Sequence, residues 1–110
     1  IPNKHIPDAF DLNGYELMEL HRILAEQRLE LAEKDETITG FNVGFNSGVD
    51  AGQTVDHAHI HLIPRRKGDV EDPTGGIRNI FPDKGNYKKE PKSKLSAAAS
   101  YEGYDNRNYG

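Results

Sequence analysis

Three histidines alternate with apolar residues along one short run, His57-Ala58-His59-Ile60-His61-Leu62-Ile63. Successive side chains of a β-strand point to opposite faces of its sheet, so a period of two predicts a strand with all three imidazoles on one face. Ala58, Ile60 and Leu62 would then occupy the other face. The run therefore constrains the chain to a sheet that packs on one side and carries ionisable groups on the other.

A helical pattern lies ahead of this run, over residues 14–34. Asn13 and Glu16 have the spacing of a capping box, which predicts that the helix begins directly after Asn13. Apolar residues recur at helical spacing, whereas most charged residues lie off their stripe. The stripe consists of Leu17, Leu20, Ile23, Leu24 and Leu31. We expect an amphipathic helix whose apolar stripe contributes to the core.

The remaining patterns predict an α+β fold in which an antiparallel sheet is flanked by one long helix. Residues 41–46 alternate as a half-buried strand, and residues 47–52 contain two glycines and read as a hairpin connection. Residues 53–63 would form the histidine strand, which Pro64 ends. Residues 77–81 are a candidate short edge segment. Residues 88–110 show neither period and are expected to be a disordered tail after one domain at residues 1–87.

Composition excludes several function classes. The chain has 110 residues and a net charge of -4, so as a whole it lacks the basic footprint of a nucleic-acid or anionic-membrane binder. It has no cysteine, which excludes disulfides, thiolate nucleophiles and Cys-ligated zinc. No apolar run approaches the roughly 20 residues of a membrane span. A cytoplasmic protein that binds neither membrane nor nucleic acid is the expectation.

The histidine run suits attack on phosphorus. Such attack needs a neutral nucleophile, donors for the phosphate oxygens and a proton for the leaving oxygen. An imidazole is largely unprotonated at pH 7, so His59 can attack without a separate strong base. The carbonyl of His57 could fix the tautomer of His59. Gly48 and Gly52 would let the backbone approach a phosphate, and Thr54 offers a hydroxyl.

Two other interpretations compete with this one. Two of the three imidazoles could hold a metal ion together with His5, His21 or an acidic residue, because imidazole is the commonest metal ligand. Strand spacing places His57 and His61 too far apart to share one ion. Alternatively, the histidines only form hydrogen bonds on a polar sheet face. His5 and His21 are expected to lie at the surface without catalytic duty.

Residues 51–64, Ala51-Gly-Gln-Thr-Val-Asp-His-Ala-His-Ile-His-Leu-Ile-Pro64, resemble the histidine triad signature. That signature is His-φ-His-φ-His-φ-φ, with φ apolar, after a Gly-Gln-Ser/Thr-Val lead-in, and the similarity extends over residues 1–87. The resemblance implies a nucleotidyl hydrolase or transferase that acts on a nucleoside phosphate ester, phosphoramidate or dinucleoside polyphosphate. It further implies a nucleotidyl-histidine intermediate, a homodimer, and no required metal or other cofactor.

The resemblance also assigns roles to individual residues. His59 corresponds to the nucleophile, His61 to the histidine that contacts phosphate and assists the leaving group, and His57 to the one that supports the loop. Asn46 holds the amide position that contacts phosphate. The phosphate-binding turn corresponds to Gly52, Gln53, Thr54 and Val55. Family members carry further residues ahead of the match to Ile1, which leaves three expectations: the sequence is a fragment, another chain supplies those residues, or the pocket is incomplete. The alternative function is a non-catalytic nucleotide- or metal-binding module.

Overall fold

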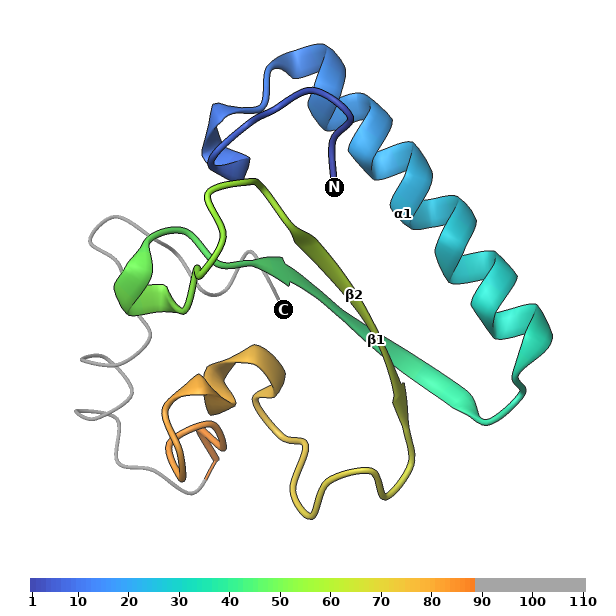
Figure 1. Ribbon diagram of the computed structural model, residues 1–110. Helices are drawn as coiled ribbons and strands as arrows, with labels where there is room; N and C mark the ends of the chain where they lie inside the picture. The colour runs from blue at the N-terminus through green and yellow to red at the C-terminus, as the bar shows by residue number, and fades with distance from the viewer. Residues whose placement is uncertain (89–110) are drawn as a thin grey trace. The chain divides into compact units, whose positions relative to one another are not determined.

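The computed structural model describes residues 1–88, which fall into two compact units, Ile1–Asp69 and a second that begins at Val70. Figure 1 shows the order of the elements along the chain. The first unit contains the 3₁₀ helix η1 (Ala9–Asp11), helix α1 (Gly14–Lys34), strand β1 (Ile38–Phe45), the 3₁₀ helix η2 (Val49–Ala51) and strand β2 (Ile60–Arg66). The second unit contains the 3₁₀ helix η3 (Gly76–Ile80).

Helix α1 begins and ends where local sequence signals place it. The side-chain oxygen of Asn13 accepts a hydrogen bond from the Glu16 amide at 2.8 Å, and the Glu16 carboxylate accepts one from the Asn13 amide at 2.9 Å. These two bonds satisfy amides that have no partner inside the helix. At the other end, the Asp35 amide donates to the Leu31 carbonyl. The predicted helix and its capping box are confirmed.

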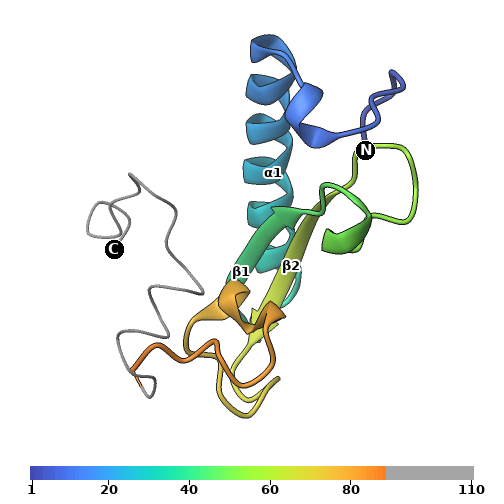
Figure 2. The ribbon, with the colours of Figure 1, turned by 90° about the vertical axis from the view of Figure 1, so that its left-hand side faces the viewer.

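Strands β1 and β2 form an antiparallel sheet, and α1 lies along one side of it (Figures 1 and 2). Val43 lies opposite Leu62 and Phe45 lies opposite Ile60, which gives the sheet one apolar face. His61 lies opposite Gly44, on the other face. The α+β fold, with an antiparallel sheet and one long flanking helix, is confirmed.

The predicted bounds of the histidine strand are wrong. Strand β2 begins at Ile60 rather than at residue 53, because the Ala58 amide donates to the Ile6 carbonyl at 2.6 Å and not to β1. The connection from β1 is therefore longer than the predicted hairpin loop. Pro64 does not end the strand, which continues to Arg66. A proline is tolerated where its nitrogen faces an open sheet edge, and in the described residues β2 pairs only with β1.

The buried core of the described chain is small. Ile6, Ala9 and Ala58 are buried, and Leu12 and Ile60 pack against them. Within residues 1–88, no residue of α1 is fully buried, and Leu17 and Ile23 remain about half exposed. The expectation that the leucine stripe is core is therefore met only in part. A two-stranded sheet offers too little area to cover a helix of this length.

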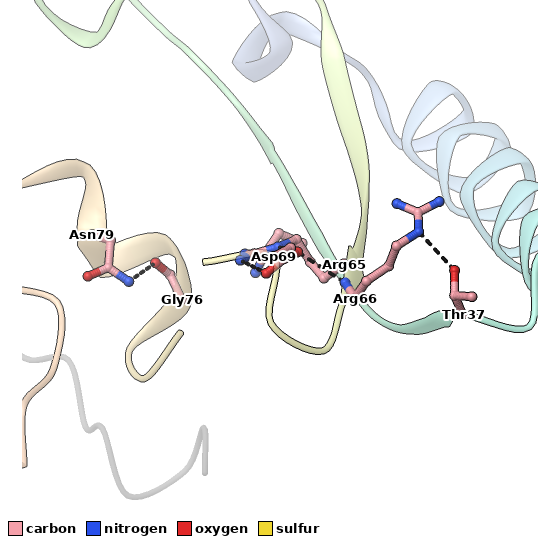
Figure 3. A network of polar contacts seen from close by, with 7 residues as sticks. Thr37, Arg65, Arg66, Asp69, Gly76 and Asn79 are labelled. Atoms are coloured by element: carbon pink, nitrogen blue, oxygen red, sulfur yellow. Dashed lines mark hydrogen bonds and ion pairs between the residues drawn. The ribbon is translucent and has the colours of Figure 1, made fainter. Parts of the chain in front are cut away.

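A network of hydrogen bonds and ion pairs connects the end of β2 to the residues just before β1 (Figure 3). The Arg65 guanidinium donates to both oxygens of Asp69, at 2.7 and 3.0 Å, and to the Asn42 side chain at 2.6 Å. Arg66 donates to the Thr37 hydroxyl at 3.0 Å and to Asp35 at 2.7 Å. These bonds give Arg65 and Arg66 structural partners at the end of the sheet.

The second unit differs from its prediction. Residues 77–81 were expected to form an edge segment, whereas Gly76–Ile80 is a 3₁₀ helix. Gly75 and Gly76 adopt positive φ values of 93° and 53°, which turn the chain instead of extending it. Tyr87 packs under the Arg78 guanidinium, 5.4 Å from the ring centroid.

The expected disordered tail lies outside the described residues, apart from residue 88. Among the helices of residues 1–88, none combines the length and the hydrophobicity of a membrane span.

Candidate active site

The residues that the sequence singled out gather around one hollow of about 230 Å³ in the first unit. The end of β1, the connection that follows it and the start of β2 supply them. The lining consists of Asn46, Gly52, Gln53, Thr54, Val55, His57, His59 and His61. The structure therefore brings all eight predicted site residues together, although only His61 lies within a strand. Their individual roles remain predictions.

The loop before the histidines turns on glycines. Gly48 precedes η2 with φ 91°, and Gly52 follows it with φ 97°, values that a residue with a Cβ adopts only with strain. A Cβ at Gly52 would meet the side-chain nitrogen of Asn46 at 3.7 Å, an ordinary van der Waals distance, so the constraint at Gly52 is its backbone conformation. These turns bring the backbone of residues 52–55 to the edge of the hollow.

Gln53 braces this loop. Its side-chain oxygen accepts a hydrogen bond from the Gly48 amide at 2.9 Å, and its side-chain nitrogen donates to the carbonyls of Pro7 and Val55 at 2.7 and 3.1 Å. The structure thus ties Gln53 to three backbone groups, one of which belongs to the N-terminal segment. We infer that Gln53 shapes the hollow in addition to lining it.

His59 points its ring to solvent while one ring nitrogen is held. Its Nδ1 donates to the carbonyl oxygen of His57 at 2.7 Å, because a carbonyl can only accept. In a neutral imidazole the proton on Nδ1 leaves Nε2 with a free lone pair. The carbonyl that the sequence analysis suggested is the one that fixes this tautomer. His59 is exposed, so Nε2 is accessible from the hollow.

His57 is the most enclosed of the three histidines. Its Nε2 donates to the Pro2 carbonyl at 3.1 Å, and its ring meets the ring of His59 edge to face, with centroids 5.9 Å apart. His61 is the second residue of β2, where it is exposed and lies opposite Gly44. The imidazoles thus occupy different environments: His57 is held by the fold, whereas His59 and His61 face the open hollow.

The N-terminal segment supports the site in a way that the sequence analysis did not predict. Pro2, Ile6 and Pro7 offer carbonyls to His57, Ala58 and Gln53. The Asp8 carboxylate accepts a hydrogen bond from the Ser47 hydroxyl, and this bond together with the Phe10 amide lowers the pKa of Asp8. Backbone carbonyls carry no residue-specific signal, so no sequence pattern marked these contacts.

A metal site would need a cluster of ligands. Among the residues that the structure describes, no three histidine, aspartate or glutamate side chains are grouped so that they could hold one ion. His5 and His57 do approach each other, but their rings lie face to face. Ring nitrogens bind metals in the plane of the ring, so a stacked pair does not converge on a shared ion.

Comparison with known proteins places this geometry in context. Residues 1–68 match the HIT domain. The chain is 36% identical over 93 residues to the nitrilase and fragile histidine triad fusion protein NitFhit of Caenorhabditis elegans, covering 84% of this chain and 20% of that protein. It is 39% identical over 72 residues to the asymmetrical bis(5'-nucleosyl)-tetraphosphatase of Schizosaccharomyces pombe, covering 66% of this chain and 39% of that protein.

The fold shows the same similarity. The crystal structure of the C. elegans NitFhit protein matches with a TM-score of 0.55 at 25% sequence identity, over 88% of this chain and 19% of that one. The chain thus spans at most about two fifths of the length of these relatives.

Proposed function

Because this chain belongs to the HIT domain family, we propose that it transfers a nucleotidyl group through His59. The observation that carries the proposal is the hydrogen bond from His59 Nδ1 to the His57 carbonyl, which leaves Nε2 unprotonated beside an open hollow. Nucleotide hydrolases are among the relatives, including the bis(5'-adenosyl)-triphosphatase of Dictyostelium discoideum. The substrate class is a nucleoside phosphate ester, phosphoramidate or dinucleoside polyphosphate.

The reaction proceeds in two steps. His59 Nε2 attacks the α-phosphorus, a P–N bond forms, and the bond from phosphorus to the leaving group breaks. The leaving group takes a proton from His61 in its protonated form, a role that the presence of His61 in the same hollow supports. Water, or another acceptor, then attacks the phosphorus of the nucleotidyl-histidine and gives its proton to the now neutral His61, while the P–N bond breaks and frees His59.

The hollow supplies donors for the phosphate oxygens. Asn46, Thr54 and the residues of the 52–55 loop line it, and their amide, hydroxyl and backbone N–H groups are the donors that we propose for the phosphate. Preorganised donors stabilise the charge that develops on the phosphate in the transition state. Neither step uses a metal ion, so activity in the presence of EDTA is part of the proposal.

The decisive experiment replaces the nucleophile. His59→Ala should lower kcat for adenosine phosphoramidate or diadenosine triphosphate by a factor on the order of 10³ or more. The assay measures AMP release in EDTA, and mass spectrometry of wild-type protein quenched rapidly at alkaline pH, where a P–N bond to histidine survives, tests for the adenylyl adduct. His21→Ala, an exposed position of α1, is the matched control and should remain fully active. Wild-type turnover by His59→Ala would contradict the proposal.

The size of the hollow favours a second candidate function. About 230 Å³ is less than the roughly 300–1,000 Å³ typical of complete small-molecule sites, so the described residues hold a phosphate more readily than a whole nucleotide. A non-catalytic module with an incomplete pocket, which binds a nucleotide by its phosphate alone, would show AMP binding by calorimetry without product release or adduct. Turnover by the wild type would exclude that module.

A further inference from the structure

The ring of His5 lies flat on the ring of His57. The two centroids are 5.3 Å apart and the ring planes are inclined by 14°. This distance lies within the range of attractive ring pairs. His5 belongs to the segment ahead of η1, far from His57 in the sequence, and the reaction proposed above gives it no task. Its contact was not predicted, because His5 was expected to be a surface residue without a role.

The stack compensates for a weakness in how His57 is held. One hydrogen bond, from Nε2 to the Pro2 carbonyl, fixes one corner of the ring. The opposite nitrogen, Nδ1, is buried and has no hydrogen-bond partner in the described part of the chain. A ring joined to the chain at Cγ and held by one hydrogen bond at Nε2 can still rock about its χ2 bond. The flat face of His5 blocks this rotation and so fixes the plane of His57.

The orientation of His57 affects the proposed nucleophile. The His59 ring meets the His57 ring at 89° with centroids 5.9 Å apart, while His59 Nδ1 donates to the carbonyl of the same residue at 2.7 Å. One residue thus supplies both contacts that orient His59. A tilt of the His57 ring would disrupt its edge-to-face contact with the His59 ring.

We propose that His5 is a positioning residue for nucleotidyl transfer, acting on His59 through the ring of His57. The kinetic part of this inference rests on the proposed function. Small displacements of a reacting group reduce the rate of the chemical step strongly, whereas they affect substrate binding less. The loss should therefore appear in kcat and not in KM.

Three variants test the proposal kinetically. His5→Ala should lower kcat on the order of tenfold and leave KM within about twofold of wild type. His5→Phe keeps a flat ring without ionisable nitrogens and should restore most of kcat, since the contact is a stack and not a hydrogen bond. His21→Ala is the matched control. Wild-type kcat in His5→Ala, or no difference between Ala and Phe at this position, would overturn the proposal.

A measurement without substrate separates this inference from the proposed function. Long-range ¹H–¹⁵N correlation spectra report which nitrogen of each imidazole carries the proton. His59 should hold its proton on Nδ1 in wild type and in His5→Phe. In His5→Ala it should exchange between both tautomers, because a tilted His57 ring no longer keeps the His59 ring where Nδ1 reaches the His57 carbonyl. If wild type is inactive but this spectral change occurs, the function fails and the positioning role stands. If wild type is active but His5→Ala changes neither kcat nor the spectra, the positioning role fails.

Discussion

His59 depends on one backbone oxygen for its tautomer. The His57 carbonyl binds Nδ1 at 2.7 Å, and this single bond decides which ring nitrogen is free to attack. Histidines alone would not define a nucleophile, since either nitrogen of a neutral imidazole can carry the proton. The chemistry of the site is therefore determined jointly by a side chain and by the local path of the chain.

The backbone conformation of Gly52 also shapes the site. Its φ of 97° lies in the left-handed region, where a Cβ costs about 1–2 kcal/mol. Gly52→Ala should therefore lower the free energy of unfolding by about that amount, and it should reduce turnover because the loop that lines the hollow shifts. Thermal or urea unfolding, together with the AMP-release assay, measures both effects.

Gly40→Ala is the matched control for Gly52→Ala. Gly40 lies in β1 without a positive φ, and a Cβ there meets nothing within 4 Å. It should change stability little and leave turnover intact. Equal destabilisation by the two substitutions would show that the conformation at Gly52 is not what matters.

At the scale of the elements, Asp35 stabilises the connection between α1 and β1. Its carboxylate accepts hydrogen bonds from the Thr37 hydroxyl and amide and from the Arg66 guanidinium. The Thr37 hydroxyl, followed by Arg66, lowers the pKa of Asp35 from 3.8 to about 2. One side chain thus links the end of α1 to the end of β2.

The lowered pKa makes this stabilisation pH-dependent. A carboxyl whose pKa is depressed on folding contributes stability that is fully present above its unfolded pKa of 3.8 and is lost as pH falls through about 2. Asp35→Asn should lower the melting temperature by a few degrees near neutral pH, and the gap to wild type should close between those two values. Calorimetry at a series of pH values measures the gap.

The control for Asp35→Asn is Asp50→Asn. The Asp50 carboxylate lies on η2 and is exposed. This substitution should produce a melting-temperature difference that does not follow the same pH window. A gap between wild type and Asp35→Asn that stays constant down to pH 2 would contradict the role of the Asp35 carboxylate.

At the scale of the whole molecule, the first unit leaves large apolar side chains uncovered. Tyr15 and Met18 on α1 are 73% and 72% exposed, and Ile63 on β2 is 48% exposed. Two-stranded sheets are marginally stable on their own, and large apolar side chains left exposed in number are typical of a surface that another chain covers. The homodimer expected from the family resemblance would cover such a surface.

We therefore predict that the chain self-associates. Light scattering after size exclusion should give twice the chain mass, and the melting temperature should rise with protein concentration because the dimer binds only folded protein. Met18→Glu should shift the equilibrium toward monomer, while Gln27→Glu, the same charge change at an exposed polar position of α1, should not. A monomer whose melting temperature is independent of concentration would contradict this prediction.

Short stretches of sequence were sufficient to predict the bounds of α1 and the set of residues that line the hollow. Asn13 and Glu16 lie within one helical turn, so their reciprocal hydrogen bonds depend on nothing outside that turn. The eight residues that line the hollow lie between Asn46 and His61, so their proximity follows from one loop between two strands. These features were predictable because the groups that interact are close in sequence.

The tertiary structure decided what local patterns left open. Strand β2 begins at Ile60 because the Ala58 amide pairs with Ile6, and His5 acquires its contact because the N-terminal segment folds back on the loop. Both depend on groups some fifty residues apart along the chain. The alternation of residues 57–63 determines which side chains share a face of the strand. It does not determine which carbonyl each backbone amide binds, because that depends on the packing of distant segments.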